Sequence, residues 1–446
     1  MGNGCSVLIG DEPDLVGKQC STTAQCGAEA RCVAGSCVAL DGGTGGGSSA
    51  GGSASGGTGG GSAAGGSAAG GSAAGGSAAG GSAAGGSSAG GSTGGGSTAG
   101  GSTGGGASDA GAPDAGFINT WVRLTPMGSI TDRGQPVVGT DAASGSIFVF
   151  GGASSAGFLS DTWKLSVPQT QLTWSQVLAS GTPPPQRSGF ATVFDSARRK
   201  LYVHGGYVDA ASGDGTTWAF DVATTTWSVV STSGPARSYA AMAFDPTRNV
   251  ALLFGGRIQP NDIDQNDVWQ FNGTSWTQLT VSGTPPPARE DHSAFFDPVG
   301  NTLFIFGGFV SPGDPDANGR SDTWALSGFG GGTPTWQQVS AAPVPPARWG
   351  AGVAYDPDRR LFVLFGGAGA RFGANAVLRG DTWTFNPATL SWREGLNGQP
   401  PLTSPSARYK LGLTWSPLHQ RVLLFGGFGP FGSNMSYSDT WVYGGP

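Results

Sequence analysis

The chain has 446 residues, among them 83 glycines, 14 tryptophans and 5 cysteines, and its formal net charge at pH 7 is −6. Because 29 acidic residues outnumber 23 basic ones, the chain lacks the basic excess that binds phosphate backbones, so the sequence argues against a nucleic-acid partner. No stretch reaches the roughly 18 consecutive apolar residues that indicate a membrane span.

Composition divides the chain into three parts. All cysteines lie at or before Cys37 and all tryptophans lie at or after Trp121, while every residue from 42 to 108 is Gly, Ala, Ser or Thr. We therefore expect a cysteine-rich segment at 1–41, a low-complexity linker at 42–116 and a folded domain at 117–446. Only the last part has enough apolar residues to bury a sizeable core.

The first residues leave the mode of attachment open. They lack the charged start and the apolar stretch of a secretory signal. In one interpretation a signal peptide lies upstream, and Cys5 is the lipid-carrying cysteine of a surface lipoprotein. In a second, Gly2 and Ser6 match the pattern for N-myristoylation. In a third, the segment carries no anchor.

Four further cysteines lie within 18 residues, at Cys20, Cys26, Cys32 and Cys37. With no histidine nearby and no CxxC pair, their spacing favours two disulfides over a zinc site and leaves three connectivities open. Such bridges imply an oxidising compartment. The segment resembles the short cysteine-rich segments that precede Gly/Ser stalks in bacterial surface proteins.

The linker is expected to be a flexible tether. It repeats Gly-Gly-Ser-Ala-Ala and has almost no side chain to bury, so nothing offsets the entropy of ordering it. For a Gly/Ser coil of this length, random-coil scaling gives an end-to-end distance of about 45 Å.

A motif spanning 18 residues recurs six times in the domain. Each copy runs from an arginine to a Gly-Gly pair, and an aspartate lies eight residues after the arginine in every copy except the last, which has Ser416. We predict a β-hairpin in each copy, with an apolar second strand buried on both faces. The arginines are Arg133, Arg187, Arg237, Arg289, Arg348 and Arg408.

Tryptophans form two columns after the Gly-Gly pairs. The first usually lies in Asp-Thr-Trp and the second follows 7 to 12 residues later. The last copy, with Trp441, lacks the second tryptophan, and Trp121 at the start of the domain has the same local pattern as the missing residue. We therefore predict that the strand of Trp121 completes the last sheet and closes a ring.

This pattern of Gly-Gly pairs and two spaced aromatics resembles the kelch repeat over essentially all of residues 117–446. The resemblance implies an all-β fold, a six-bladed β-propeller whose innermost strand follows each arginine. In an up-and-down blade, the loops after Gly-Gly and before the arginine share one face. Because these loops vary in length and the first hairpin does not, we expect recognition there, at the mouth of the central channel.

Candidate ligand-binding residues on that face form two groups. The longest loops combine aromatic rings with arginines, which suits sugars or protein hot spots, unless these rings pack on one another. This loop group is Phe309, Arg371, Phe372, Arg379, Phe428, Phe431 and Tyr437. The second group stands beside the arginines where other copies have small residues, and is Glu290, Asp291, His292, Trp349, Tyr409 and Lys410.

The six arginines have two interpretations. They are either a ring of cations that binds an anion, or a structural column. A residue present once in every blade usually has a structural role within the blade, so we expect each arginine to bond neighbouring carbonyls or an aspartate.

Catalysis is not expected, and no resident cofactor is predicted. Copper-radical oxidases with kelch propellers need a cysteine cross-linked to a tyrosine, and no cysteine follows Cys37. Glu290, Asp291 and His292 form the only compact acid/base cluster, and consecutive residues on a strand point to opposite faces, so the three should not converge. An enzyme acting on a sugar is the alternative.

One segment resembles the start of a calcium loop. Asp314, Asp316 and Asn318 have the required spacing, but Ala325 stands where the bidentate glutamate is needed. These residues are therefore weak candidates for calcium.

Together these features predict a secreted or surface-tethered extracellular protein. Its propeller would act as a monomeric, non-catalytic module that binds a glycan or a protein. An intracellular kelch adaptor is the other alternative.

Overall fold

The computed structural model describes residues 30–33, 36–39, 120–166, 171–207, 213–310, 319–369, 377–395 and 404–444. The predictions for the linker lie outside these residues, as do those for Cys5, Cys20, Cys26, Asp314, Asp316, Asn318, Arg371 and Phe372. Within the described ranges, no helix has the length and apolar character needed to cross a membrane.

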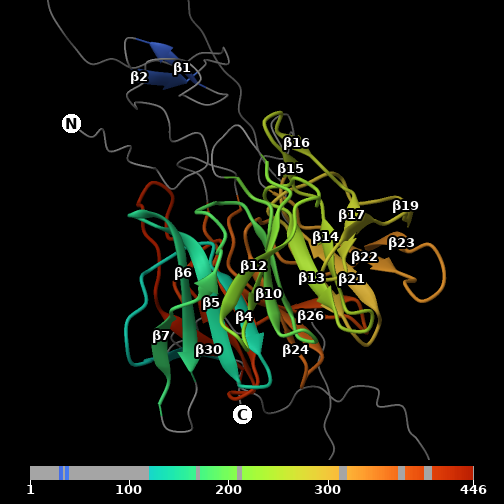
Figure 1. The fold of residues 1–446 in the computed structure, drawn as a ribbon. Coiled ribbons are helices and arrows are strands. Elements are labelled where there is room, and N and C mark those ends of the chain that lie inside the picture. Colours follow the sequence, from blue (N-terminus) through green and yellow to red (C-terminus); the bar gives the residue numbers. More distant parts are fainter. Residues whose placement is uncertain are drawn as a thin grey trace, which may run out of the picture. The chain divides into compact units, whose positions relative to one another are not determined.

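The domain consists of six blades, each built on four antiparallel strands (Figure 1). Blade 1 contains β4 (Val137–Asp141), β5 (Ser146–Ser154), β6 (Gly157–Ser166) and β7 (Thr173–Val177). Blade 2 contains β9 (Ala191–Asp195), β10 (Lys200–His204), β11 (Thr217–Asp221) and β12 (Thr226–Ser231). Blade 3 contains β13 (Ala241–Asp245), β14 (Val250–Phe254), β17 (Val268–Phe271) and β18 (Trp276–Gln278).

The second half of the ring repeats this arrangement. Blade 4 contains β20 (Ser293–Asp297), β21 (Thr302–Phe306), β22 (Thr323–Ser327) and β23 (Thr335–Val339). Blade 5 contains β24 (Gly352–Asp356), β25 (Leu361–Phe365), β26 (Thr382–Asn386) and β27 (Ser391–Glu394). Blade 6 contains β28 (Gly412–Ser416), β29 (Arg421–Phe425), β30 (Thr440–Tyr443) and β3 (Trp121–Leu124).

Short additional strands lie beside some of the blades and near the N-terminus. β8 (Ser180–Gly181) and β19 (Ser282–Gly283) add a parallel strand to the outer edges of blades 2 and 4. β15 (Arg257–Ile258) and β16 (Ile263–Asp264) form a small hairpin within blade 3. Near the N-terminus, β1 (Ala30–Val33) pairs with β2 (Ser36–Ala39), and the register places Cys32 opposite Cys37. The disulfide pairing stays a prediction.

The six innermost strands form a closed ring. β13 contacts β9 and β20, β24 contacts β20 and β28, and β4 contacts both β28 and β9. The strand after each arginine is therefore the innermost one, and the prediction of a six-bladed propeller is confirmed.

The ring closes through the N-terminal strand. β3 pairs antiparallel with β30, so Trp121 lies opposite Tyr443 and Leu124 opposite Thr440. The Trp121 ring lies 5.0 Å from both Phe365 and Tyr443, measured between centroids. Its Nε1 donates a hydrogen bond of 2.9 Å to Oγ1 of Thr382 in blade 5. The predicted closure is thereby confirmed.

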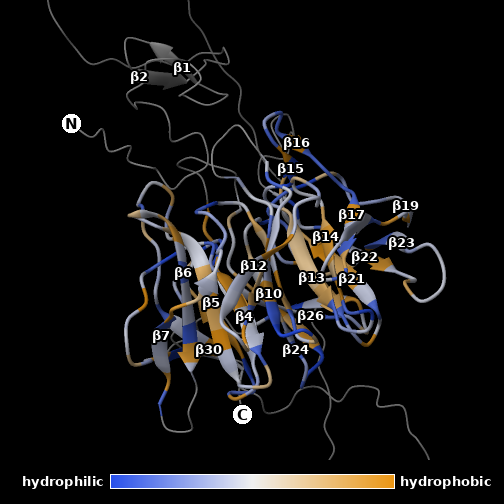
Figure 2. Ribbon diagram, in the orientation of Figure 1, coloured by the Kyte–Doolittle hydropathy of each residue, from blue (hydrophilic) through white to orange (hydrophobic). Residues whose placement is uncertain are grey.

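The hydrophobic core lies between adjacent blades. The second strands are apolar and buried on both faces, as in β14 and β21, where every residue is buried. Figure 2 shows this apolar character as orange strands in the interior of the sheets. Phe295 of blade 4 and Phe362 of blade 5, for example, have ring centroids 4.5 Å apart. Each fully buried side chain of this kind contributes about 1.5 to 3 kcal/mol.

Four of the six outer tryptophans, including Trp121, also connect neighbouring blades by hydrogen bonds. Trp392 Nε1 of blade 5 donates to Thr323 Oγ1 of blade 4 at 2.9 Å, and Trp276 and Trp227 donate to the equivalent threonines of the preceding blades. Blade 3 has Val268 at the threonine position, and Nε1 of Trp336 is buried without a partner among the described residues.

We therefore expect Val268→Thr to raise the free energy of unfolding by about 1 kcal/mol, because the new hydroxyl would accept a hydrogen bond from the unpaired Nε1 of Trp336. Chemical denaturation would measure the change. The matched control is Thr323→Val in the next blade, which removes the acceptor of Trp392. It should destabilise the protein by about 1 to 3 kcal/mol. Equal destabilisation by both variants would contradict this account.

Candidate functional site

The six repeated arginines are structural. Arg348 is fully buried, its Nη1 donates to the Gly366 carbonyl at 3.0 Å, and its two terminal nitrogens bind the Asp381 carboxylate at 2.7 and 2.6 Å. Asp381 also accepts a hydrogen bond of 2.8 Å from Trp383 Nε1. The equivalent ion pairs are Arg133–Asp161, Arg187–Asp214, Arg237–Asp267, Arg289–Asp322 and Arg408–Asp439. The structural interpretation of this column is confirmed.

These ion pairs lower the pKa values of their carboxylates. Burial alone would raise the pKa of Asp381, but the hydrogen bonds and the charge of Arg348 outweigh it and hold the pKa below the usual value. The pKa values of Asp161, Asp214, Asp322 and Asp439 are lowered for the same reasons.

Two residues after each arginine, the backbone adopts the same left-handed conformation in every blade. We call these six positions the mouth ring: Gln135, Gly189, Tyr239, Asp291, Gly350 and Lys410, with φ between 50° and 65°. Backbone hydrogen bonds join neighbouring members, as from Lys410 N to the Gly350 carbonyl at 2.7 Å and from Gln135 N to the Lys410 carbonyl at 2.6 Å. Non-glycine residues adopt this conformation at a cost of about 1 to 3 kcal/mol.

The mouth ring surrounds a cavity of about 150 Å³ at the entrance of the channel. Every blade contributes to its lining: Gln135, Pro136, Phe190, Tyr239, Ala240, Asp291, His292, Gly350, Ala351, Lys410 and Leu411. Of the residues that the sequence singled out, Asp291, His292 and Lys410 lie here. Gln135 and Tyr239 were missed, although their position two residues after an arginine is the signal that would have found them.

The ammonium of Lys410 meets side chains from three other blades. Its Nζ lies 3.3 Å from Oδ2 of Asp291, 4.3 Å from the centre of the Tyr239 ring and 5.6 Å from that of Trp349. Since Lys410 belongs to blade 6 and Tyr239 to blade 3, the lysine side chain extends across the mouth of the channel.

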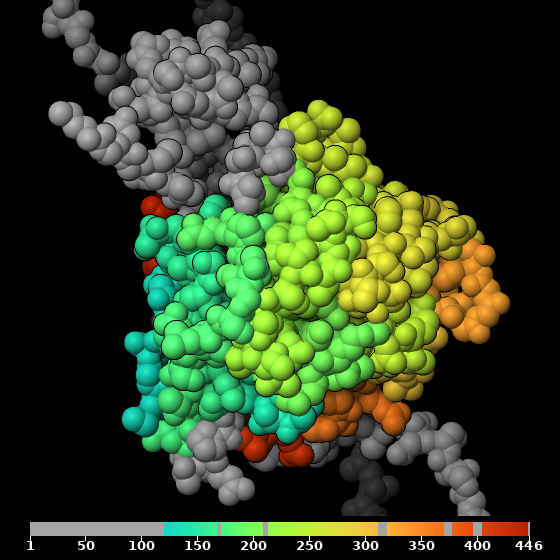
Figure 3. Space-filling view, viewed as in Figure 1, coloured from blue at the N-terminus to red at the C-terminus, as the bar shows by residue number. Residues whose placement is uncertain are grey.

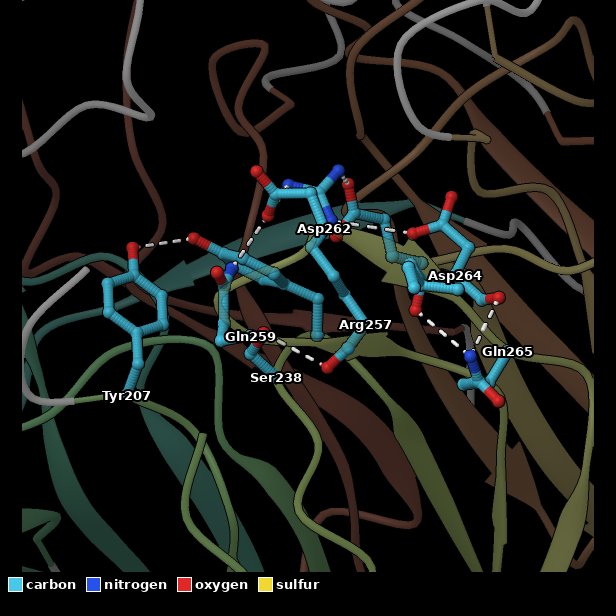
Figure 4. Close-up of polar contacts among 10 residues, drawn as sticks. Tyr207, Ser238, Arg257, Gln259, Asp262, Asp264 and Gln265 are labelled. Atoms are coloured by element: carbon cyan, nitrogen blue, oxygen red, sulfur yellow. Dashed lines mark hydrogen bonds and ion pairs between the residues drawn. The ribbon is translucent and has the colours of Figure 1, made fainter. Parts of the chain in front are cut away.

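A second charged cluster borders the mouth ring at the β15–β16 hairpin (Figure 4). Arg257 binds Asp262 at 3.2 Å, Asp264 at 3.4 Å and the buried carboxylate of Glu290. Burial would lower the pKa of Arg257, but these three carboxylates outweigh it and raise the pKa. The Arg257–Glu290 pair fixes the hairpin against blade 4, and the hairpin stands out as a ridge in Figure 3.

This cluster adjoins the mouth ring, because Glu290 directly precedes Asp291, and Ser238, whose N–H donates to the Arg257 carbonyl at 3.0 Å, directly precedes Tyr239. The Tyr207 and Tyr239 hydroxyls lie 2.7 Å apart, and their rings are 5.7 Å apart between centroids. The polar wall formed by blades 2 to 4 is therefore continuous with the surroundings of Lys410.

Five aromatic residues of the two sequence groups pack on one another on the opposite side of the mouth. Phe309, Trp349 and Tyr409 are buried, and Phe428 and Phe431 are partly buried against them. The Tyr409 and Phe431 rings stack at 4.6 Å. Of the two alternatives for these rings, the structure shows the packed one. Their role in ligand binding stays a prediction.

The remaining loop residues differ in their partners. The Tyr437 ring lies 3.9 Å from the Arg408 guanidinium carbon. Arg379 is half-buried, its Nε donates to the Ala347 carbonyl at 3.2 Å, and in the described part of the chain no carboxylate lies within ion-pair distance of it. Burial and the nearby Arg348 charge lower the pKa of Arg379.

The acid/base cluster separates as expected, but for another reason. Glu290, Asp291 and His292 precede β20 instead of lying on it, so the expectation that they alternate along a strand was wrong. The left-handed backbone of Asp291 turns the chain between Glu290 and His292. Glu290 binds Arg257 and Asp291 binds Lys410. His292 packs against Phe254 with centroids 5.2 Å apart, and burial lowers its pKa to about 3.

The other two histidines are packed as well. His204 is buried, with Nδ1 2.9 Å from Thr217 Oγ1 and Nε2 2.9 Å from the Pro235 carbonyl, and burial lowers its pKa to about 4. His419 lies in the turn before β29, with Nδ1 2.8 Å from Ser416 Oγ.

Comparison with known proteins gives a consistent result. The family described as the KLHDC2/KLHL20/DRC7 Kelch-repeats domain matches residues 117–272 and 243–444. The Kelch domain-containing protein 3 of Rattus norvegicus and that of Homo sapiens are each 27% identical over 254 residues, which is 55% of this chain and 62% of theirs. The Rab9 effector protein with kelch motifs of Bos taurus is 27% identical over 207 residues, covering 45% of this chain and 54% of that protein.

A solved structure supports the same fold. The structure titled "Structure of YjhT" aligns with a TM-score of 0.54 and 14% identity, covering 71% of this chain and 95% of that one. The chain spans 62% of the length of the Kelch domain-containing protein 3 relatives, so their whole-protein activities do not transfer. The family match spans the entire propeller, and the chain therefore belongs to the kelch-repeat family.

Proposed function

We propose that this chain is a non-catalytic binding module that recognises a protein partner through the mouth ring and the loops around it. The observation that carries the proposal is that six positions with one backbone conformation hold Gln, Gly, Tyr, Asp, Gly and Lys around a shared cavity. A rigid frame that presents varied side chains is typical of a recognition surface.

Rigidity of the frame favours affinity. The buried Arg–Asp pairs and the backbone hydrogen bonds of the mouth ring hold the loops before any ligand arrives. Binding therefore orders few groups, which reduces its entropic cost. Arg379 adds a guanidinium that an acidic side chain of the partner can engage with two parallel hydrogen bonds.

The relatives agree with a role in protein binding. They are named as kelch proteins, and one of them is named an effector of Rab9. A glycan is the second candidate ligand, because the cavity combines the Tyr239 ring with the polar side chains of Gln135 and Asp291, and sugars present both hydroxyls and apolar faces. An extracellular location, with attachment through Cys5 and the linker, completes the proposal.

The test uses the full chain. A partner captured from an extract of the source cells would be purified and titrated against wild type, Tyr239→Gly and Arg379→Ala. Glycine suits the backbone at position 239 because Gly189 and Gly350 occupy equivalent positions. We expect each variant to weaken binding at least about tenfold, the equivalent of 1.4 kcal/mol.

The control is Leu418→Ala, in the turn between β28 and β29, a side chain that is 50% exposed. It should leave the affinity unchanged. A partner whose affinity falls with Leu418→Ala but not with Tyr239→Gly or Arg379→Ala would place recognition on the opposite face and overturn the proposal. A parallel glycan array, on which binding is lost with Tyr239→Gly, would identify the ligand as a sugar.

A further inference from the structure

The mouth of the channel already contains a bound alkylammonium group, which is the end of the Lys410 side chain. Its nitrogen lies over the Tyr239 ring at 4.3 Å and beside Asp291 at 3.3 Å. The electron-rich face of an aromatic ring and a carboxylate are the two groups that bind ammonium ions best in proteins. The surroundings of Lys410 are therefore a built site for a cation.

Two features of the mouth ring make this arrangement possible. Lys410 has a φ of 50°, a conformation that glycine adopts without cost. Gly350 lies under the lysine stem, and a Cβ atom there would approach Lys410 Cγ to 3.3 Å. The lysine thus crosses over a neighbour that lacks a side chain, and its own side chain is only 7% exposed.

The wall beyond Lys410 is also suited to cations. Glu290, Asp262 and Asp264 bind the guanidinium of Arg257 next to the Tyr207–Tyr239 pair. Glu290 and Asp264 are buried, whereas the Asp262 side chain is 26% exposed, so Asp262 is the carboxylate of this cluster that a basic segment of a partner can reach.

We propose that Tyr239, Asp291 and Trp349 form an alkylammonium site that the free chain fills with its own Lys410, and that a lysine side chain of the partner takes over this site on binding. The proposal rests on the protein-binding function proposed above and specifies the group that is recognised. Lys410 Nζ occupies the place over the Tyr239 ring and beside Asp291 Oδ2, so the ammonium of the partner's lysine can take that place only when Lys410 leaves it. Lys410 thus acts as a tethered competitor.

The test removes the internal occupant. In the full chain, Lys410→Gly should fold, because glycine suits the left-handed backbone, and Lys410→Asn provides a second variant that tolerates this conformation. The probe is n-butylammonium chloride, which has the length of a lysine side chain. We expect the melting temperature of both variants to rise saturably, by roughly 2 °C at ten times the dissociation constant.

Four controls define the site. Wild type should respond only at concentrations at least about tenfold higher, because Lys410 competes. An added Asp291→Asn substitution should abolish the response of Lys410→Gly. A mixture of n-butanol and sodium chloride should have no effect on it. An acetylated and amidated Gly-Lys-Gly tripeptide should follow n-butylammonium, whereas its norleucine analogue should not.

The proposal fails if neither folded variant responds to n-butylammonium, or if the response survives the loss of Asp291. It also fails if sodium acetate stabilises wild type and not Lys410→Gly, because the mouth would then bind carboxylates through Lys410. These results leave the partner titration with Tyr239→Gly and Arg379→Ala untouched, so failure of the ammonium site and failure of the protein-binding function can be told apart.

Discussion

Replacement of Asp381 by asparagine is expected to lower the free energy of unfolding by about 3 kcal/mol. Arg348 is fully buried, and the substitution leaves its charge without a counterion. Breaking a buried pair from one side costs about 3 to 5 kcal/mol, and the lower value applies because the Asp381 side chain is 20% exposed. Equilibrium unfolding in guanidinium chloride would measure the loss.

Asp358→Asn is the matched control. Asp358 is an exposed aspartate in the same blade, in the turn between β24 and β25. Its replacement should change stability by less than about 0.5 kcal/mol. If the two variants lost the same stability, the ion pair would not have the structural role described here.

Acidification should reproduce this destabilisation in five blades together. The folded-state pKa values of Asp161, Asp214, Asp322, Asp381 and Asp439 lie below the usual 3.8, so the unfolded chain binds protons first as the pH falls. Their contribution is fully present above the unfolded-state pKa and is lost as the pH falls from there through the folded values. Asp381→Asn should therefore lose less stability than wild type between pH 5 and pH 2.

Trp121→Ala should destabilise the protein by about 3 to 5 kcal/mol, because it leaves a cavity between blades 5 and 6 and removes the hydrogen bond to Thr382. The loss falls at the strand that joins the two ends of the propeller, so the seam should also become the first region to exchange its amide hydrogens. Thermal unfolding and hydrogen exchange of β28, β29 and β30 would measure both effects.

Val122→Ala on the same strand is the control, since Val122 is 42% exposed and its loss should have a small effect. A Trp121→Ala protein that melts like the parent would show that the closing strand does not hold the ring together.

The fold was predictable because the sequence repeats the same blade motif six times. The arginine and the Gly-Gly pair recur at fixed spacing and the tryptophans recur in the same order, so each repeat supports the interpretation of the others. The missing tryptophan of the last repeat identified Trp121 as its replacement. The same repetition predicted the type of partner, a carbonyl or an aspartate, but not which aspartate of each blade binds the arginine.

The site was predictable only where it departs from the repeat. Asp291, His292 and Lys410 stood out against the small residues of other blades, whereas Tyr239 did not. The direction of their side chains depends on a left-handed backbone that four non-glycine residues adopt, which no local pattern reveals. The pairing of Glu290 with Arg257 joins loops of different blades, and the packing of Phe309 under Trp349 depends on tertiary contacts.

The strand that closes the ring is also the first strand after the linker. Any mechanical pull transmitted along the linker therefore enters the propeller at Trp121, through the four residue pairs that β3 forms with β30. A force along the strand loads these pairs simultaneously, in shear, together with the tryptophan that is anchored in blade 5. A force across the strand would load them one after another, so the resistance of the propeller to a pull at its N-terminal strand depends on the direction of that pull.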